Sequence, residues 1–110
     1  MKKNISLWEV LVPCKMHDKP VRTKHHKEWD KYVRKITNGL TILKPARGQW
    51  VDDSNELHEE RMIQVRVACT DKQIDKIIDF TLRHYDQLAV MAYLISTKVI
   101  IKHKNEHAKI

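Results

Sequence analysis

Basic and imidazole side chains gather in one short segment of this sequence, and their chemistry is that of anion binding. Residues 15–27 hold Lys15, His17, Lys19, Arg22, Lys24, His25, His26 and Lys27. Thr23 can cap a helix that starts here, and the free N–H groups of a helix start favour an anion. The segment therefore predicts an anion site that uses Arg22, Lys24, His25 and His26. A solvated basic loop is the alternative interpretation.

A second cluster combines a guanidinium and an indole within four residues. Arg47, Gly48, Gln49 and Trp50 follow Pro45 in the sequence. An arginine can pair with a phosphate and an indole can stack on a base, so Arg47 and Trp50 are predicted to bind a nucleotide-like ligand. The alternative is a bulged hairpin whose Trp50 packs against the core.

Catalytic and metal-binding patterns are weak. Glu59 and Glu60 follow His58, but adjacent carboxylates on a strand face opposite ways and cannot share one reacting atom. His25 and His26 are also adjacent, whereas metal ligands on a helix favour a spacing of four. The sequence has no glycine-rich phosphate loop and no nucleophile elbow. We therefore predict no catalytic residue, no metal and no cofactor.

Net charge and cysteine content limit the class of protein that this chain can belong to. The chain has 110 residues, with 21 Lys and Arg against 14 Asp and Glu, a net charge of +7. This balance favours anionic partners, with nucleic acid as a secondary alternative because acids are interleaved with the bases. Cys14 and Cys69 show no metal spacing and are expected to be reduced. With no signal peptide and no membrane span in the sequence, we expect a cytoplasmic protein with no membrane partner.

Hydrophobic periodicity predicts the order β-α-β-β-α-β. Alternation over 5–12 predicts a strand, and a helix of about four turns follows from Thr23 to a left-handed stop at Asn38-Gly39. A strand over 40–44 can continue to 51 past a bulge at Gly48, and the returning strand spans 57–69. Thr70 and Gln73 form a capping box that opens the second helix. Strands over 88–95 and 99–101 complete the order.

This order is that of a ferredoxin-like α+β sandwich, an antiparallel sheet with two helices on one face and a short extra C-terminal strand. We expect one domain over 1–102 and a charged tail over 103–110. The other sheet face would carry Leu7, Leu11 and an apolar row of the last long strand. Exposed apolar area on this scale predicts a homodimer or higher homo-oligomer.

The motifs Asn38-Gly39-Leu40-Thr41 and Gly48-Gln49-Trp50, followed by Glu59 or Glu60 and a helix leading to Tyr85, carry a resemblance. They resemble an uncharacterised bacterial family of small ferredoxin-like domains with a "GLT…GxW" pattern, over about residues 24–95. The basic segment 15–27 and the missing export signal depart from that family. In size the chain is also similar to small bacteriophage accessory proteins, some of which sequester host nucleotide signals.

The function predicted from the sequence is non-enzymatic binding of a small anionic ligand, a nucleotide or a phosphorylated signal, in the manner of a sequestering phage protein. A protein-interaction module or inhibitor that docks on a host protein is one alternative. A small ferredoxin-like enzyme that uses His25, His26 or Glu60 is the other.

Overall fold

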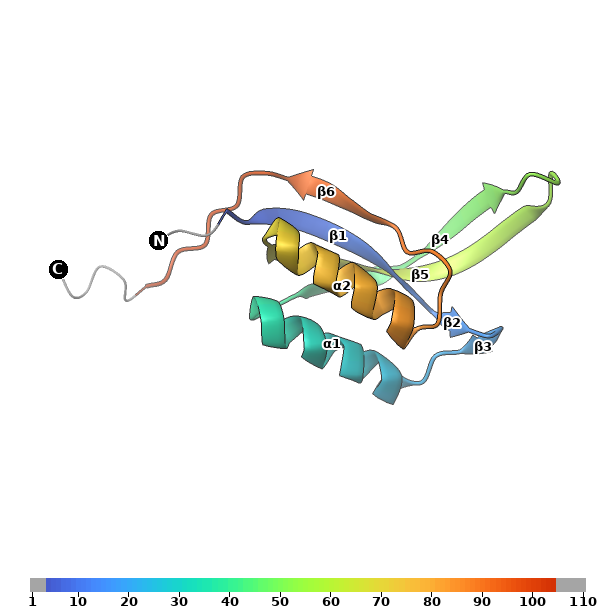
Figure 1. Ribbon diagram of the computed structural model, residues 1–110, viewed down its shortest axis with the longest axis horizontal. Coiled ribbons are helices and arrows are strands. Elements are labelled where there is room, and N and C mark those ends of the chain that lie inside the picture. Colours follow the sequence, from blue (N-terminus) through green and yellow to red (C-terminus); the bar gives the residue numbers. More distant parts are fainter. Residues whose placement is uncertain (1–3, 105–110) are drawn as a thin grey trace.

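Two helices and a four-stranded antiparallel sheet form the body of the protein, as the sequence predicts (Figure 1). The computed structural model describes residues 4–104. The elements are β1 (Ser6–Pro13), β2 (Lys15–Met16), β3 (Lys19–Pro20), α1 (Thr23–Thr37), β4 (Thr41–Val51), β5 (Leu57–Cys69), α2 (Asp71–His84) and β6 (Ala92–Ser96).

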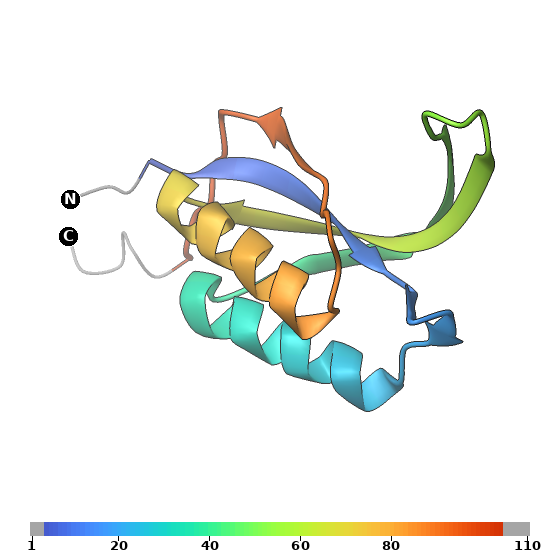
Figure 2. The ribbon, with the colours of Figure 1, turned by 45° about the vertical axis from the view of Figure 1, so that its right-hand side comes forward.

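The sheet has the strand order β4-β5-β1-β6, so β1 lies in its interior between β5 and β6. Both helices cover the same face, and the long β4–β5 hairpin extends past their ends (Figures 1 and 2). Within the basic segment 15–27, residues 15–20 form the small β2–β3 hairpin. No helix among residues 4–104 is long and apolar enough to cross a membrane.

The core lies between the helices and the sheet, where the apolar residues of each element recur at its own period. Val10 on β1 pairs with Val65 on β5, and both are buried under the helices. Trp29 on α1 is buried too, and its Nε1–H donates to Thr81 Oγ1 on α2 at 2.8 Å. The Thr81 hydroxyl in turn donates to the Ile77 carbonyl at 2.6 Å. This chain of hydrogen bonds satisfies the polar atoms of Trp29 and Thr81 within the core.

Two of the three predicted helix ends are confirmed. Thr70 and Gln73 form the capping box of α2, and Asn38 ends α1 in the left-handed conformation with φ 71°. The prediction that Thr23 caps α1 is wrong, because Thr23 is already helical. Arg22 occupies the cap position with an extended backbone and no side-chain cap bond. The N–H groups at the start of α1 therefore lack a capping side chain.

The β4 strand is continuous from Thr41 to Val51, but its irregularity lies elsewhere than predicted. The register shifts between Ile42 and Pro45, because proline lacks the N–H that a regular ladder requires. Gly48 pairs regularly with Glu60 instead. A Cβ on Gly48 would come within 2.6 Å of the Met62 methyl carbon, the flexible end of that side chain, which would have to shift.

The C-terminal strand assignments need correction. The last strand covers Ala92–Ser96 rather than 88–95, and residues 99–101 form no strand in the described part of the chain. Leu88 is fully exposed, and Ile100 and Ile101 are largely exposed. Of the predicted run 88–91, Val90 packs against the core, and the Met91 carbonyl accepts a hydrogen bond from the Leu11 N–H at 3.0 Å. The Ser96 hydroxyl bonds the backbone of Lys98 and turns the chain off the sheet edge. Residues 105–110 of the predicted tail lie outside the described residues.

The sheet face opposite the helices is not uniformly apolar, in contrast to the prediction. Glu9 lies at its centre, 1% exposed. Its carboxylate accepts hydrogen bonds from Arg66 Nε and Gln64 Nε2, both at 3.0 Å, and from the Tyr93 hydroxyl. Burial by itself would raise the pKa of Glu9, but these three donors together hold it below its ordinary value. The face therefore has a polar, hydrogen-bonded centre.

We predict that Thr81→Val, which keeps the shape of the side chain, lowers the free energy of unfolding by about 1–3 kcal/mol. The reason is that Trp29 Nε1–H would stay buried without an acceptor. Urea denaturation followed by tryptophan fluorescence measures the change. Thr41→Val, at an exposed strand position, is the matched control and should cost far less. Equal losses in the two variants would contradict the role given to this bond.

Candidate functional site

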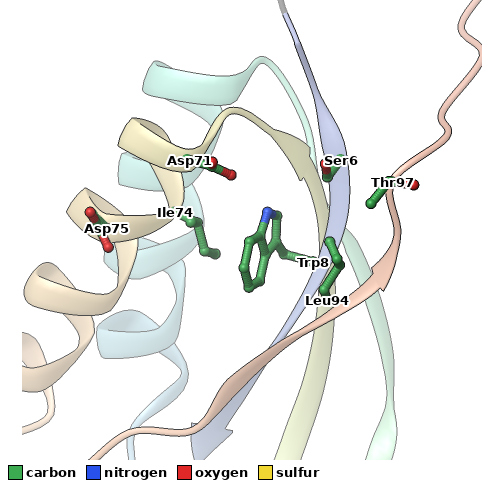
Figure 3. A pocket seen from close by; sticks show the side chains of 7 residues that line it. All are labelled: Ser6, Trp8, Asp71, Ile74, Asp75, Leu94 and Thr97. Atoms are coloured by element: carbon green, nitrogen blue, oxygen red, sulfur yellow. The ribbon is translucent and has the colours of Figure 1, made fainter.

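A pocket of about 460 Å³ opens between β1, α2 and β6 (Figure 3). The side chain of Trp8 forms its floor, and Ile74 and Leu94 flank the indole on the helix side and on the strand side. Three elements meet here: Trp8 on β1 and Leu94 on β6 pair across the strands, and Ile74 faces them from α2. The pocket is therefore apolar at its base.

The indole nitrogen of Trp8 is the unusual atom of this pocket. Nε1 is buried, and among the described residues it has no hydrogen-bond partner. In Figure 3 the nitrogen lies on the side of the ring where Asp71 and Ser6 stand. Buried donors in proteins are almost always paired, so the unpaired Nε1–H of Trp8 is unusual, and an acceptor that reached it would be stabilised.

Two carboxylates give the rim of the pocket a negative charge. Asp71 and Asp75 are one turn apart on α2 and share one face of the helix. Both are exposed, and neither forms an ion pair with residues 4–104. Ser6 and Thr97 supply hydroxyl groups from β1 and from the segment after β6. The site thus offers one buried donor, an aromatic face, two hydroxyls and two carboxylates.

The predicted anion-site histidines are engaged with the end of α2. The rings of His25 and His84 stack with centroids 3.7 Å apart, and each ring Nε2 lies within 2.8 Å of the other residue's carbonyl oxygen. His26 Nδ1 is 2.7 Å from the Tyr85 hydroxyl. Although adjacent, both imidazoles therefore contact the end of α2, and they hold the start of α1 against it.

The remaining predicted residues fall in two separate places. Arg22 and Lys24 are exposed at the start of α1. Arg47 and Trp50 lie on β4 in the long hairpin, which belongs to the sheet layer (Figures 1 and 2). Trp50 is 49% exposed and stacks on His58 with ring centroids 4.3 Å apart, and Arg47 pairs with Arg61 across the strands. The structure therefore does not bring the hairpin residues and the helix start into one site.

One group of potential metal ligands occurs at the hairpin turn. The ligand atoms of Asp52, Glu56 and His58 lie within 4.8 Å of one another. Asp52 already accepts a hydrogen bond from His58 Nε2 at 2.8 Å and from the N–H groups of Ser54 and Glu56. These bonds, with His58 the largest contributor, lower the pKa of Asp52. The turn is thus ordered by its own hydrogen bonds.

Sequence reasoning missed the Trp8 pocket and the Glu9 cluster. The alternation of Trp8 and Glu9 on β1 was a usable signal, because it places the two side chains on opposite faces. Their partners come from β5, β6 and α2, far along the chain, and no sequence spacing links them. The pairing of Glu9 with Arg66 and Tyr93 needs the strand order β5-β1-β6.

Comparison with known proteins places the fold. No family model and no curated protein matches the chain. Among solved structures, it is similar to a phage SAM lyase in complex with S-methyl-5'-thioadenosine, with a TM-score of 0.65 and 14% identity over 88% of this chain and 84% of that one. It is also similar to the divalent ion tolerance protein CutA1 from Ehrlichia chaffeensis, with a TM-score of 0.60 and 13% identity over 87% and 83% of the two chains. The divalent cation tolerance protein from Thermus thermophilus aligns with a TM-score of 0.62 and 10% identity over 96% and 92%.

These likenesses confirm the ferredoxin-like α+β class that the sequence predicts. At such low identity they define the fold alone. The "GLT…GxW" family resemblance has no matching family model behind it.

We predict that the protein loses stability as the pH falls from 7.5 to 5.5. Burial lowers the pKa of His26, and positive charge on His25 and His84 lowers it further against the opposing Asp30. The folded state therefore binds fewer protons than the unfolded state below the ordinary histidine pKa of about 6.5. His26→Asn should reduce this loss, as measured by urea denaturation at the two pH values. His103→Asn, at an exposed position, is the control, and an unchanged slope in His26→Asn would contradict the assignment.

Proposed function

We propose that the protein is a small-ligand-binding protein that holds a nucleoside in the pocket between β1, α2 and β6. The observation that carries this proposal is the buried, unpartnered Nε1–H of Trp8, whose indole lines a 460 Å³ pocket. A purine offers both a flat ring for contact with the indole and ring nitrogens that accept a hydrogen bond. Ribose hydroxyls can donate to the carboxylates of Asp71 and Asp75, which is a common way to hold that sugar.

The charge of the rim bears on the class of nucleoside. A phosphate beside Asp71 and Asp75 would be repelled, whereas a positive charge would be attracted to both carboxylates and to the indole face. We therefore propose a nucleoside that is neutral or carries a sulfonium or ammonium group, in place of the anionic nucleotide expected from composition. The ligand in the similar phage SAM lyase, S-methyl-5'-thioadenosine, is a nucleoside without phosphate, and this supports the ligand class.

A binding protein of this kind would act by sequestration, the role that the sequence suggests for a phage accessory protein. Holding a nucleoside without converting it removes that compound from the host pool. No catalytic residue is needed for this role.

Isothermal titration with three probes tests the ligand class: S-adenosylmethionine, S-methyl-5'-thioadenosine and AMP, which carry a positive, a neutral and a negative group on the ribose. We expect affinity to fall in that order. Trp8→Phe, which keeps a ring but removes the N–H, should weaken both nucleosides by about tenfold. Asp75→Asn should weaken the sulfonium probe more than the neutral nucleoside, and Asp79→Asn on an exposed turn of α2 is the matched control.

Two results would overturn this proposal. Tightest binding of AMP would contradict the charge argument, and binding unaffected by Trp8→Phe would contradict the site. Chromatography of the S-adenosylmethionine mixture tests the non-enzymatic part, because release of S-methyl-5'-thioadenosine would indicate an enzyme.

The basic residues predicted from the sequence are proposed as a separate anion site. Arg22 and Lys24 stand at the start of α1, where no side chain caps the free N–H groups and the first turn has no acid. We expect Arg22→Ala with Lys24→Ala to abolish weak binding of inorganic phosphate, followed by phosphorus NMR. Arg47→Ala with Trp50→Ala should remove stacking of a nucleotide base on the hairpin. Binding unchanged in both double variants would exclude these residues as ligand-binding groups.

We also propose that the protein forms a homodimer or higher homo-oligomer, as the sequence predicts. The hairpin exposes Trp50, Val51 and Leu57, and Met91 and Ile95 are exposed just before and within β6. Native mass spectra of the protein before and after ligand addition report the assembly directly.

A further inference from the structure

A second, smaller pocket lies between α1 and the sheet, away from the Trp8 pocket. Its volume is about 160 Å³, and its walls are mostly apolar, with Ile42, Ile63 and Val65 among them. Three polar residues line it as well: His26 and Asp30 from α1, and Tyr85 from the end of α2. An apolar cavity of about 150 Å³ is large enough to hold benzene. The pocket therefore has room for one six-membered ring.

The hydrogen bond between His26 and Tyr85 determines which nitrogen of the imidazole carries the proton. Tyr85 is fully buried, and among the described residues its hydroxyl bonds His26 Nδ1 at 2.7 Å. A buried hydroxyl proton needs an acceptor, so the Tyr85 hydroxyl donates to Nδ1. Burial and the charge of Asp30 raise the pKa of Tyr85, which keeps the phenol protonated. The proton of the neutral imidazole then resides on Nε2, and His26 keeps one N–H to donate.

Asp30 supplies the complementary group one helical turn further along α1. Residues four apart on a helix are neighbours on one face, so the carboxyl lies on the same side of α1 as the imidazole. Asp30 is half-buried, and burial raises the pKa of its carboxyl despite the opposing charges of Arg34 and His26. A half-buried carboxylate is stabilised by a donor from a ligand.

We propose that this pocket binds a single ring that carries a carboxamide, whose oxygen accepts from His26 Nε2–H and whose NH₂ donates to Asp30. The apolar walls contact the ring, and His26 and Asp30 recognise the carboxamide through these hydrogen bonds. Tyr85 acts as a positioning residue, since it sets which imidazole nitrogen carries the proton. This pocket and its ligand are independent of the nucleoside site.

Benzamide is the probe, and toluene and benzoate are its matched controls at pH 7.5. Toluene lacks the polar group, and benzoate is repelled by Asp30 and lacks a donor. Histidine side-chain NMR follows the His26 ring during each titration. We expect saturable shifts at His26 with benzamide, with a dissociation constant of about 1 mM, and at least about fivefold weaker binding of both controls.

Three variants and one control locate the site. Ile42→Trp should fill the pocket and abolish benzamide binding, whereas Leu57→Trp, at a similarly exposed hairpin position, should not, the two side chains being 53% and 59% exposed. Asp30→Ala should weaken benzamide several-fold and leave toluene unchanged. Tyr85→Phe should shift the His26 nitrogen signals toward the other tautomer and weaken benzamide.

The proposal is overturned by an absence of saturable shifts, by equal affinity for benzoate and benzamide, or by benzamide binding that survives Ile42→Trp. Wild-type His26 signals that show the proton on Nδ1 would overturn the role of Tyr85. Since none of these variants lines the Trp8 pocket, failure here leaves the nucleoside titrations unaffected.

Discussion

The contact between the two antiparallel helices is the constraint on which the rest of the structure depends. At its centre, Trp29 Nε1 donates to Thr81 within the core. At one end, His25 and His84 stack and each contacts the other's backbone carbonyl, and at the other end, Gln73 Nε2 donates to the Ile36 carbonyl at 2.6 Å. These contacts join the start of each helix to the end of its partner, so the pair covers the sheet as one layer (Figure 1).

Both pockets follow from the way this layer meets the sheet. The start of α2 stands beside β1 and β6, where Trp8 leaves a hollow with a carboxylate rim. The start of α1 stands over β4 and β5, where His26 and Asp30 border a smaller apolar hollow. The two sites therefore differ in charge and size although each is built by the first turns of a helix against strand side chains. A chain with a net charge of +7 can thus present a locally negative pocket.

The strand layer has its own polar constraint in Glu9. A carboxylate with 1% exposure must be compensated, and three donors from β5 and β6 provide this. Because those donors lie on the strands that flank β1, the network favours the observed strand register over a slipped one. The sequence pattern predicts an apolar sheet face opposite the helices. That face is instead polar at its centre, with apolar side chains around it.

Local sequence determined those features that depend on near neighbours. The alternation of β5, the capping box at Thr70 and the left-handed stop at Asn38 are set by residues within a few positions, and each was predictable. The basic character of residues 15–27 was equally plain, but sequence could not say that His25 and His26 would be engaged by the end of α2. Tertiary structure alone decided that Trp8 has an unpaired N–H, that Glu9 has three donors and that His26 meets Tyr85. The physical reason is that these contacts join residues more than fifty positions apart, and only the packing of helices on a sheet with the order β4-β5-β1-β6 brings them together.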